Sequence, residues 1–91
     1  MSEVHHETVF FSGRVQGVGF RYTALQVAKE FEVTGWVKNL VDGRVQLEAE
    51  GAPQTVKAFV VALSERMHGY IRKTEHQSAK REPQFVGFTI R

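Results

Sequence analysis

The run from Gly13 to Arg21, GRVQGVGFR, holds three glycines and ends on an arginine. Glycine lacks a Cβ and adopts positive φ angles readily, so successive backbone N–H groups in such a run can curl into a concave nest for an anion. The arginine adds a planar fork of donors that fits phosphate oxygens. These residue types at this spacing favour a site for a phosphoryl group.

A helix is expected to begin near Arg21, and the first turn of a helix offers free N–H groups and the positive end of its dipole. These groups would add to the anion site. The alternative is that the three glycines only turn the chain. The candidate phosphate-binding residues are Val15, Gln16, Gly17, Val18, Gly19, Phe20 and Arg21.

Two common nucleotide motifs do not match this run. A Walker loop needs a glycine, four further residues and then Gly-Lys-Ser/Thr, and the run has neither that lysine nor that hydroxyl. The dinucleotide pattern needs a third glycine, but Gly17-Val18-Gly19 is followed by Phe20, Arg21 and Tyr22. The sequence therefore does not favour a nucleotide ligand.

The composition narrows the function classes further. With 91 residues, 42% hydrophobic and 24% charged, the sequence predicts a single globular domain over residues 1–91. Without cysteine it has no disulfide, thiol nucleophile or cysteine metal site. No apolar run approaches the roughly 20 residues that cross a bilayer, and the N-terminus lacks a signal-peptide core. We therefore expect a cytoplasmic monomer without a membrane partner. We also expect no nucleic-acid partner, because a net charge of +2 is too small to argue for one.

The elements around the glycine run alternate between strand and helix patterns. Short β-branched, aromatic or alternating runs predict strands, and apolar residues at i, i+3, i+4 and i+7 predict helices. Asp42-Gly43 is typical of a hairpin turn. Pro53 suits the first turn of the second helix and Gly69 its end. The predicted strands are 8–12, 35–40, 44–50, 70–77 and 85–90, and the predicted helices are 22–32 and 53–69.

Both helices have one apolar face, and the strand over 44–50 alternates between apolar and polar residues. The simplest packing is an antiparallel sheet with two helices on one face. The sequence therefore predicts an α+β, ferredoxin-like sandwich of order βαββαβ with an extra C-terminal strand.

Two long stretches resemble one family. GRVQGVGFR resembles the first signature of the acylphosphatases, and Gly35–Gly51, GWVKNLVDGRVQLEAEG, resembles their second. The resemblance covers residues 7–64 well, and the final FVGFTIR also fits. Only residues 67–84 depart from the pattern, since they lack the Gly-Pro that often follows the second helix in the family.

The resemblance implies a cofactor-free hydrolase that cleaves small acyl phosphates, with inorganic phosphate as product and competitive inhibitor. It places the catalytic arginine on Arg21, the catalytic asparagine on Asn39 and the phosphate loop on residues 15–20. It also implies that the attacking water passes its proton to the phosphate. Chemically, an arginine and a nest of N–H groups can hold the phosphate, and an asparagine amide can orient a water. Considered alone, Asn39 is equally typical of a strand end.

The remaining histidines and basic residues do not indicate a further functional site. The four histidines show no ligand spacing, and His5 and His6 are expected in a mobile terminus, so we expect no metal site. The basic pairs at 72–73 and 80–81 favour a solvated strand edge. A non-catalytic phosphate- or RNA-binding module of the same fold is the alternative. The exposed positions of the strand over 44–50 are Gln46, Glu48 and Glu50, and the anionic side chains on that face would repel RNA. A maturation-factor domain of similar sequence would normally belong to a longer chain, so we expect a free-standing enzyme.

Overall fold

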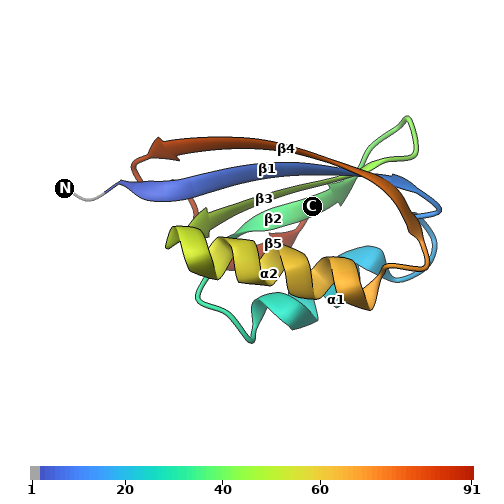
Figure 1. The fold of residues 1–91 in the computed structure, drawn as a ribbon, viewed down its shortest axis with the longest axis horizontal. Coiled ribbons are helices and arrows are strands. Elements are labelled where there is room, and N and C mark those ends of the chain that lie inside the picture. The colour runs from blue at the N-terminus through green and yellow to red at the C-terminus, as the bar shows by residue number, and fades with distance from the viewer. Residues whose placement is uncertain (1–2) are drawn as a thin grey trace.

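The computed structural model describes residues 3–91 and contains two helices and five strands among them (Figure 1). The elements are, in chain order, β1 (Val4–Gly13), α1 (Phe20–Ala28), β2 (Thr34–Asn39), β3 (Val45–Gly51), α2 (Pro53–Arg66), β4 (Ile71–Arg81) and β5 (Phe88–Ile90). Both helices lie on one side of the sheet (Figure 1). The ferredoxin-like order βαββαβ with an added C-terminal strand is therefore confirmed. Neither helix within residues 3–91 is long and apolar enough to cross a membrane.

The five strands form one sheet in the order β4-β1-β3-β2-β5. Four of the strands pair antiparallel, as predicted, but β5 runs parallel to β2, so the prediction of an all-antiparallel sheet was wrong. The reason is the path of the chain after β4. It leaves one edge of the sheet and reaches the opposite edge, where Gly35 pairs with Phe88.

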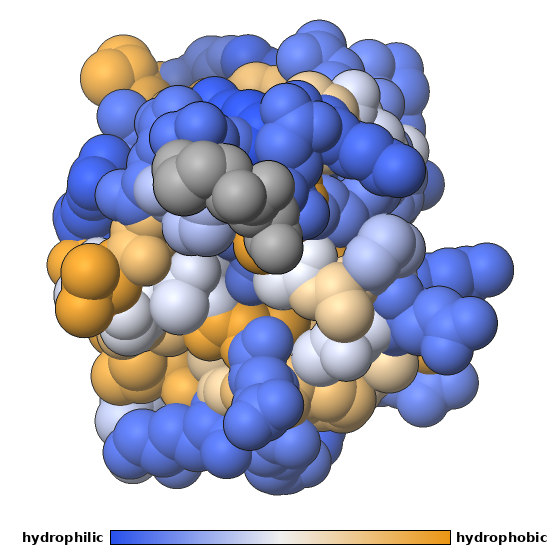
Figure 2. Space-filling view, turned by 90° about the vertical axis from the view of Figure 1, so that its left-hand side faces the viewer, coloured by the Kyte–Doolittle hydropathy of each residue, from blue (hydrophilic) through white to orange (hydrophobic). Residues whose placement is uncertain are grey.

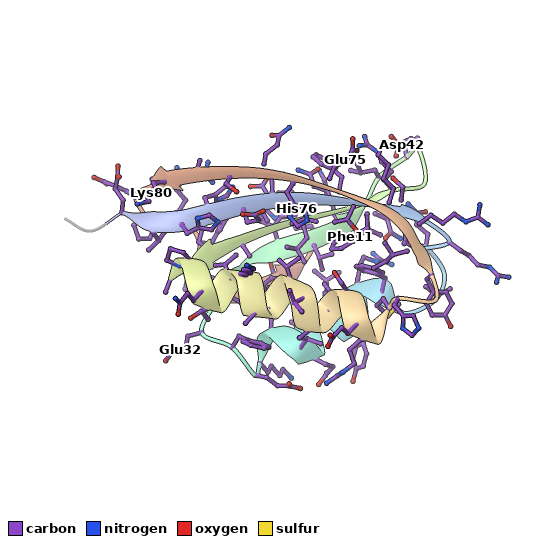
Figure 3. All side chains as sticks on the ribbon, in the orientation of Figure 1. Phe11, Glu32, Asp42, Glu75, His76 and Lys80 are labelled. Atoms are coloured by element: carbon purple, nitrogen blue, oxygen red, sulfur yellow. The ribbon has the colours of Figure 1, made fainter. Side chains whose placement is uncertain are left out.

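The core lies between the sheet and the helices. The alternate residues Val9 and Phe11 of β1 and Leu47 of β3 are fully buried and meet the apolar faces of α1 and α2. Figure 3 shows Phe11 on this side of the sheet. The Phe11 and Phe20 rings lie 4.9 Å apart between centroids, which ties the start of α1 to the sheet.

The helix ends differ from the sequence prediction. Helix α1 begins at Phe20 and ends at Ala28, whereas helical spacing predicted residues 22–32. The backbone N–H groups of Lys29, Glu30 and Phe31 donate to carbonyls three residues earlier, so the chain tightens into a turn there. Helix α2 begins at Pro53 as predicted, but it ends before Gly69.

The first strand is longer than predicted, and this changes the histidine prediction. His5 and His6 lie within β1 rather than in a mobile terminus, and both have carboxylate partners. Successive strand residues face opposite sides of a sheet. His5 therefore faces the helices and His6 faces the open side of the sheet.

On the open side, Glu50 of β3 is 2% exposed, so the prediction that it lies on a solvated face was wrong. Its carboxylate accepts hydrogen bonds from His6 Nδ1 (2.9 Å), Arg81 Nε (3.1 Å) and the Gln84 backbone N–H (2.8 Å). His6 Nε2 lies 3.0 Å from the Glu48 carboxylate, so both ring nitrogens face acids. This network joins the crossing segment after β4 to the sheet.

Glu50 should make the stability of the fold depend on pH. Burial alone raises its pKa, but the hydrogen bonds from Gln84, His6 and Arg81 outweigh burial and hold the pKa below the ordinary value of 4.5. The unfolded chain therefore takes up the proton first as pH falls. The contribution of Glu50 to stability is complete above the ordinary value and is lost as pH falls through the lower folded pKa.

We expect Glu50→Gln to lower the free energy of unfolding at pH 7 by about 3 kcal/mol, because removing one partner strands the other charges in a buried network. The variant should also lose stability less steeply than the parent between about pH 5 and pH 3. Urea unfolding across this range measures both effects. Glu30→Gln, which removes an exposed carboxylate paired with Arg66, is the control. Equal stability of Glu50→Gln and the parent at pH 7 would contradict the network.

Candidate active site

The glycine run leaves the sheet at a bulge. The register of β1 with β4 shifts between Ser12 and Gly13, and the Arg14 N–H donates to the Tyr70 carbonyl (2.9 Å). Val15 is fully buried and anchors the loop in the core. The chain then turns back and enters α1 at Phe20. A fixed loop therefore leads from the first strand into the start of a helix.

Two glycines of this loop have left-handed backbone angles, Gly17 with φ 78° and Gly19 with φ 79°. Gly19 is the N-terminal cap of α1 and contributes no side chain to it. The free N–H groups of the first helical turn thus follow directly after a glycine-rich turn. This arrangement suits an anion, because unpaired N–H groups and the helix dipole act at the same place.

One pocket brings the predicted residues together. It has a volume of about 250 Å³ and is lined by Val15, Gly17, Gly19, Phe20, Arg21, Tyr22, Asn39 and Ile90. Arg21 from α1 and Asn39 from the end of β2 therefore face one cavity, although they are distant in the sequence. Gln16 and Val18, which were also predicted to bind phosphate, are absent from this lining.

The side chain of Gln16 has a structural role, which sequence reasoning missed. Its side-chain amide donates to the carbonyl of Leu40 (2.7 Å) and to that of Arg44 (3.0 Å). These two carbonyls flank the turn between β2 and β3, where the Leu40 N–H also donates to Arg44. Gln16 thus fastens the glycine loop to the strand end that carries Asn39. No local pattern in the sequence could indicate these partners.

The two polar side chains of the pocket are available to a ligand. Among residues 3–91, the side chains of Arg21 and Asn39 make no salt bridge or hydrogen bond to the protein. Arg21 is exposed and Asn39 is half-buried. A guanidinium and an amide without protein partners can hold an oxyanion and a water in one small space.

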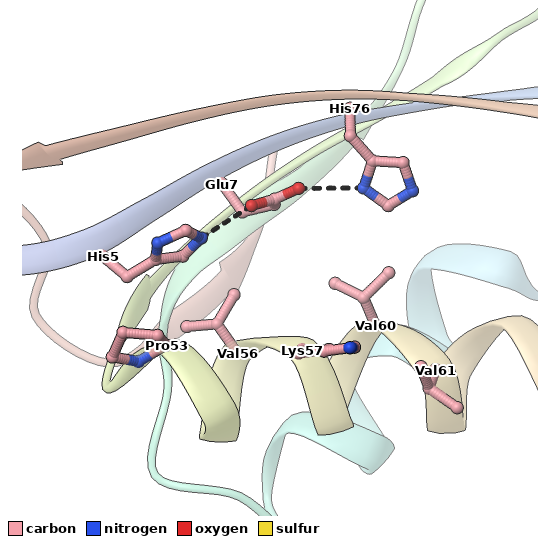
Figure 4. A pocket seen from close by; sticks show the side chains of 8 residues that line it. All are labelled: His5, Glu7, Pro53, Val56, Lys57, Val60, Val61 and His76. Carbon is pink, nitrogen blue, oxygen red and sulfur yellow. Dashed lines mark hydrogen bonds and ion pairs between the residues drawn. The ribbon is translucent and has the colours of Figure 1, made fainter.

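The histidines lie away from this pocket. Within the described residues 3–91, no group of three or more histidine, aspartate or glutamate side chains is arranged to hold a metal ion. His5 and His76 flank Glu7 in a separate cavity between α2 and the strands β1 and β4 (Figure 4). The basic pairs lie on β4, an edge strand, as predicted.

Substitution of the two loop glycines tests the nest. A Cβ at Gly17 or Gly19 would meet no atom within 4 Å, so alanine would not obstruct the loop, and only the positive φ would be strained. We expect Gly17→Ala and Gly19→Ala each to weaken inhibition by inorganic phosphate, at a cost of about 1–3 kcal/mol. Gly69→Ala is the control, because Gly69 also has open space but no positive φ. Unchanged phosphate inhibition in both loop variants would mean that the glycines only shape the turn.

The comparisons with known proteins agree with the two signatures. The family model described as Acylphosphatase matches residues 7–90. The acylphosphatase of Methanospirillum hungatei JF-1 is 39% identical over 85 residues, 92% of this chain and 93% of that protein. The acylphosphatase of Roseiflexus sp. is 38% identical over 91 residues, which are 99% of this chain and 98% of that protein. The crystal structure of acylphosphatase from Bacillus subtilis matches with a TM-score of 0.85 at 31% identity, over 94% of this chain and 97% of that one.

Near-full-length similarity, a matching family model and a shared fold all lead to the same conclusion. The chain belongs to the acylphosphatase family and hydrolyses the carboxyl–phosphate bond of acyl phosphates to a carboxylate and inorganic phosphate.

Proposed function

We propose that this hydrolysis takes place in the pocket between the glycine loop and the end of β2, with Arg21 and Asn39 as its catalytic residues. The observation that carries the proposal is the shared lining, in which both side chains lie beside Gly17 and Gly19 and bind no other side chain or carbonyl of residues 3–91. An acyl phosphate has a good leaving group, a carboxylate. The enzyme therefore needs to position the phosphoryl group and offset its charge, and it has little need of an acid.

The phosphoryl group would lie in the glycine loop. Backbone N–H groups of residues 15–20 and the guanidinium of Arg21 would donate to its oxygens, and these bonds would strengthen as charge develops during transfer. Gln16 would serve through its backbone, because its side-chain amide is engaged by two carbonyls. The acyl group would lie toward Tyr22 and Ile90, which are 63% and 40% exposed at the pocket.

Asn39 would orient the attacking water through its amide. The water oxygen forms a bond to phosphorus while the bond from phosphorus to the bridging oxygen breaks, and the carboxylate leaves with that electron pair. One proton of the water passes to a phosphoryl oxygen and the other stays on the attacking oxygen. The product is dihydrogen phosphate, so no protein base is required.

The enzyme would act as a cytoplasmic monomer with one domain over residues 1–91. Its site would hold no metal ion. The residues that line the pocket include no carboxylate, imidazole or thiol that could hold a divalent ion. The phosphoryl charge is offset by Arg21 and backbone N–H groups instead. Hydrolysis by this site therefore needs no ion for its chemistry.

Phosphate release from acetyl phosphate by the purified protein tests this site and its independence of metal. We expect the same rate, within about twofold, before and after dialysis against excess chelator, because the charge on the phosphoryl group is offset by protein donors. Added Mg²⁺ or Zn²⁺ should not raise the rate. Loss of activity in chelator and its recovery with a divalent ion would overturn the metal-free site.

A further inference from the structure

A second cavity lies away from the glycine loop, between α2 and the strands β1 and β4 (Figure 4). Its volume is about 480 Å³, which lies in the range of small-molecule sites. It exists because α2 packs on β1 and β3 and leaves the helix-facing side of the edge strand β4 uncovered. The hydrolysis proposed above uses none of its residues.

One side of this cavity is apolar. Val56, Val60 and Val61 of α2 line it, together with Pro53 at the start of that helix. Val61 is 47% exposed. Figure 2 views the molecule from the end where β1 begins and shows hydrophobic surface below the hydrophilic sheet side. An apolar segment of a ligand would find its contacts chiefly on Val61, because Val56 and Val60 are only 1% and 6% exposed.

The opposite side of the cavity is polar and ordered. The Glu7 carboxylate accepts hydrogen bonds from His5 Nε2 (2.7 Å), Ser78 Oγ (2.8 Å) and His76 Nδ1 (2.9 Å). Burial raises the Glu7 pKa, but the bonds from His5, Ser78 and His76 outweigh it and lower the pKa overall. Glu7 is thus ionised and accepts three hydrogen bonds. Each ring donates one N–H to it, which leaves His5 Nδ1 and His76 Nε2 for a ligand.

Lys57 supplies a charge that nothing in the described chain neutralises. It lies on α2 among the residues that line the cavity, its exposed side chain extends across the front of the helix in Figure 4, and within residues 3–91 it forms no salt bridge or hydrogen bond. The other ionisable groups that line the cavity are Glu7, His5 and His76, and the Glu7 carboxylate already accepts three hydrogen bonds. Lys57 is therefore the lining group with which the anionic head of a ligand would pair.

We infer that the cavity between α2 and the strands β1 and β4 is a binding site for a monocarboxylate with an apolar tail. The tail would lie on the valines, and the carboxylate would pair with Lys57. A neutral apolar molecule would leave the lysine unmatched, and inorganic phosphate would leave the valines unused.

Hexanoate is the probe. We expect its titration into the ¹⁵N-labelled full chain to shift amide resonances of residues 5–7, 56–61 and 76–78 in a saturable way. Acetate, which has the same head without the tail, should bind at least about tenfold more weakly because four methylene groups lose their burial. Hexan-1-ol, which has the tail without the charge, should also bind more weakly. Inorganic phosphate should not displace hexanoate.

Charge variants locate the head group. Lys57→Gln should weaken hexanoate binding by at least about threefold, because a charged hydrogen bond is lost. Lys29→Gln, which removes the same charge at the end of α1, should leave it unchanged. Because Lys57 is exposed, the variant should fold and keep the phosphate inhibition of the parent. Shifts confined to residues 17–21, displacement by phosphate, or equal affinity for hexanoate in Lys57→Gln would each overturn the inference.

Discussion

Replacing Asn39 by alanine is expected to lower kcat on acetyl phosphate by about 100-fold or more, with phosphate inhibition nearly unchanged. The reason is the division of work in the pocket. Asn39 would contact the water, which contributes little to holding the substrate, so the loss falls on the rate. The end of β2 carries the Asn39 amide beside the water, and removing a group that orients a reactant in the transition state is typically this costly.

Lys38→Ala is the matched control for Asn39. Lys38 is the preceding residue of β2, and its ammonium lies over the Trp36 ring on the opposite face of the sheet, 5.4 Å from the ring centroid. It should keep the parental kcat. A folded Asn39→Ala protein with normal kcat would contradict the water-orienting role, whatever its affinity for phosphate.

Arg21→Lys should impair both binding and rate, because Arg21 would contact the phosphoryl group before and during transfer. A lysine keeps the charge but replaces the planar fork with a single ammonium. We expect phosphate inhibition to weaken by roughly tenfold or more and kcat to fall by roughly 100-fold, as for loss of charge-assisted bonds in a transition state. Both constants should be measured on the same preparation.

Arg14→Lys is the control for Arg21, since Arg14 belongs to the same loop but does not line the pocket. It should behave as the parent does. If Arg21→Lys keeps normal phosphate inhibition, the fork is not what holds the phosphoryl group, and the proposed binding mode is wrong.

The sequence predicted much of the fold because its strong signals are local. The alternation over residues 44–50 marks β3, and Asp42-Gly43 falls in the turn that joins β2 to β3. Pro53 marks the start of α2. Arg21 and Asn39 could be chosen as candidates because each lies within a long signature, and both line one pocket, while their catalytic role stays a prediction.

The errors come from interactions that no local pattern encodes. The parallel pairing of β5 depends on a crossing from one sheet edge to the other, and Glu50 is buried because that crossing covers it. The alternation of β3 alone placed Glu50 on a solvated face. Local patterns also could not indicate that the Gln16 side chain binds carbonyls 24 and 28 residues away, while the contact of Gln16 with phosphate stays a prediction.

The origin of the new oxygen atom tests the central claim most directly. When acetyl phosphate is hydrolysed in water enriched in oxygen-18, mass spectrometry of the two products reports which atom the water attacked. The proposed site directs water to phosphorus, so one labelled oxygen should appear in inorganic phosphate and none in acetate. Unlabelled phosphate and acetate incubated with the protein in the same water control for exchange. Label in the acetate above that control would show attack at the carbonyl carbon, and it would contradict the phosphoryl-transfer account of this pocket.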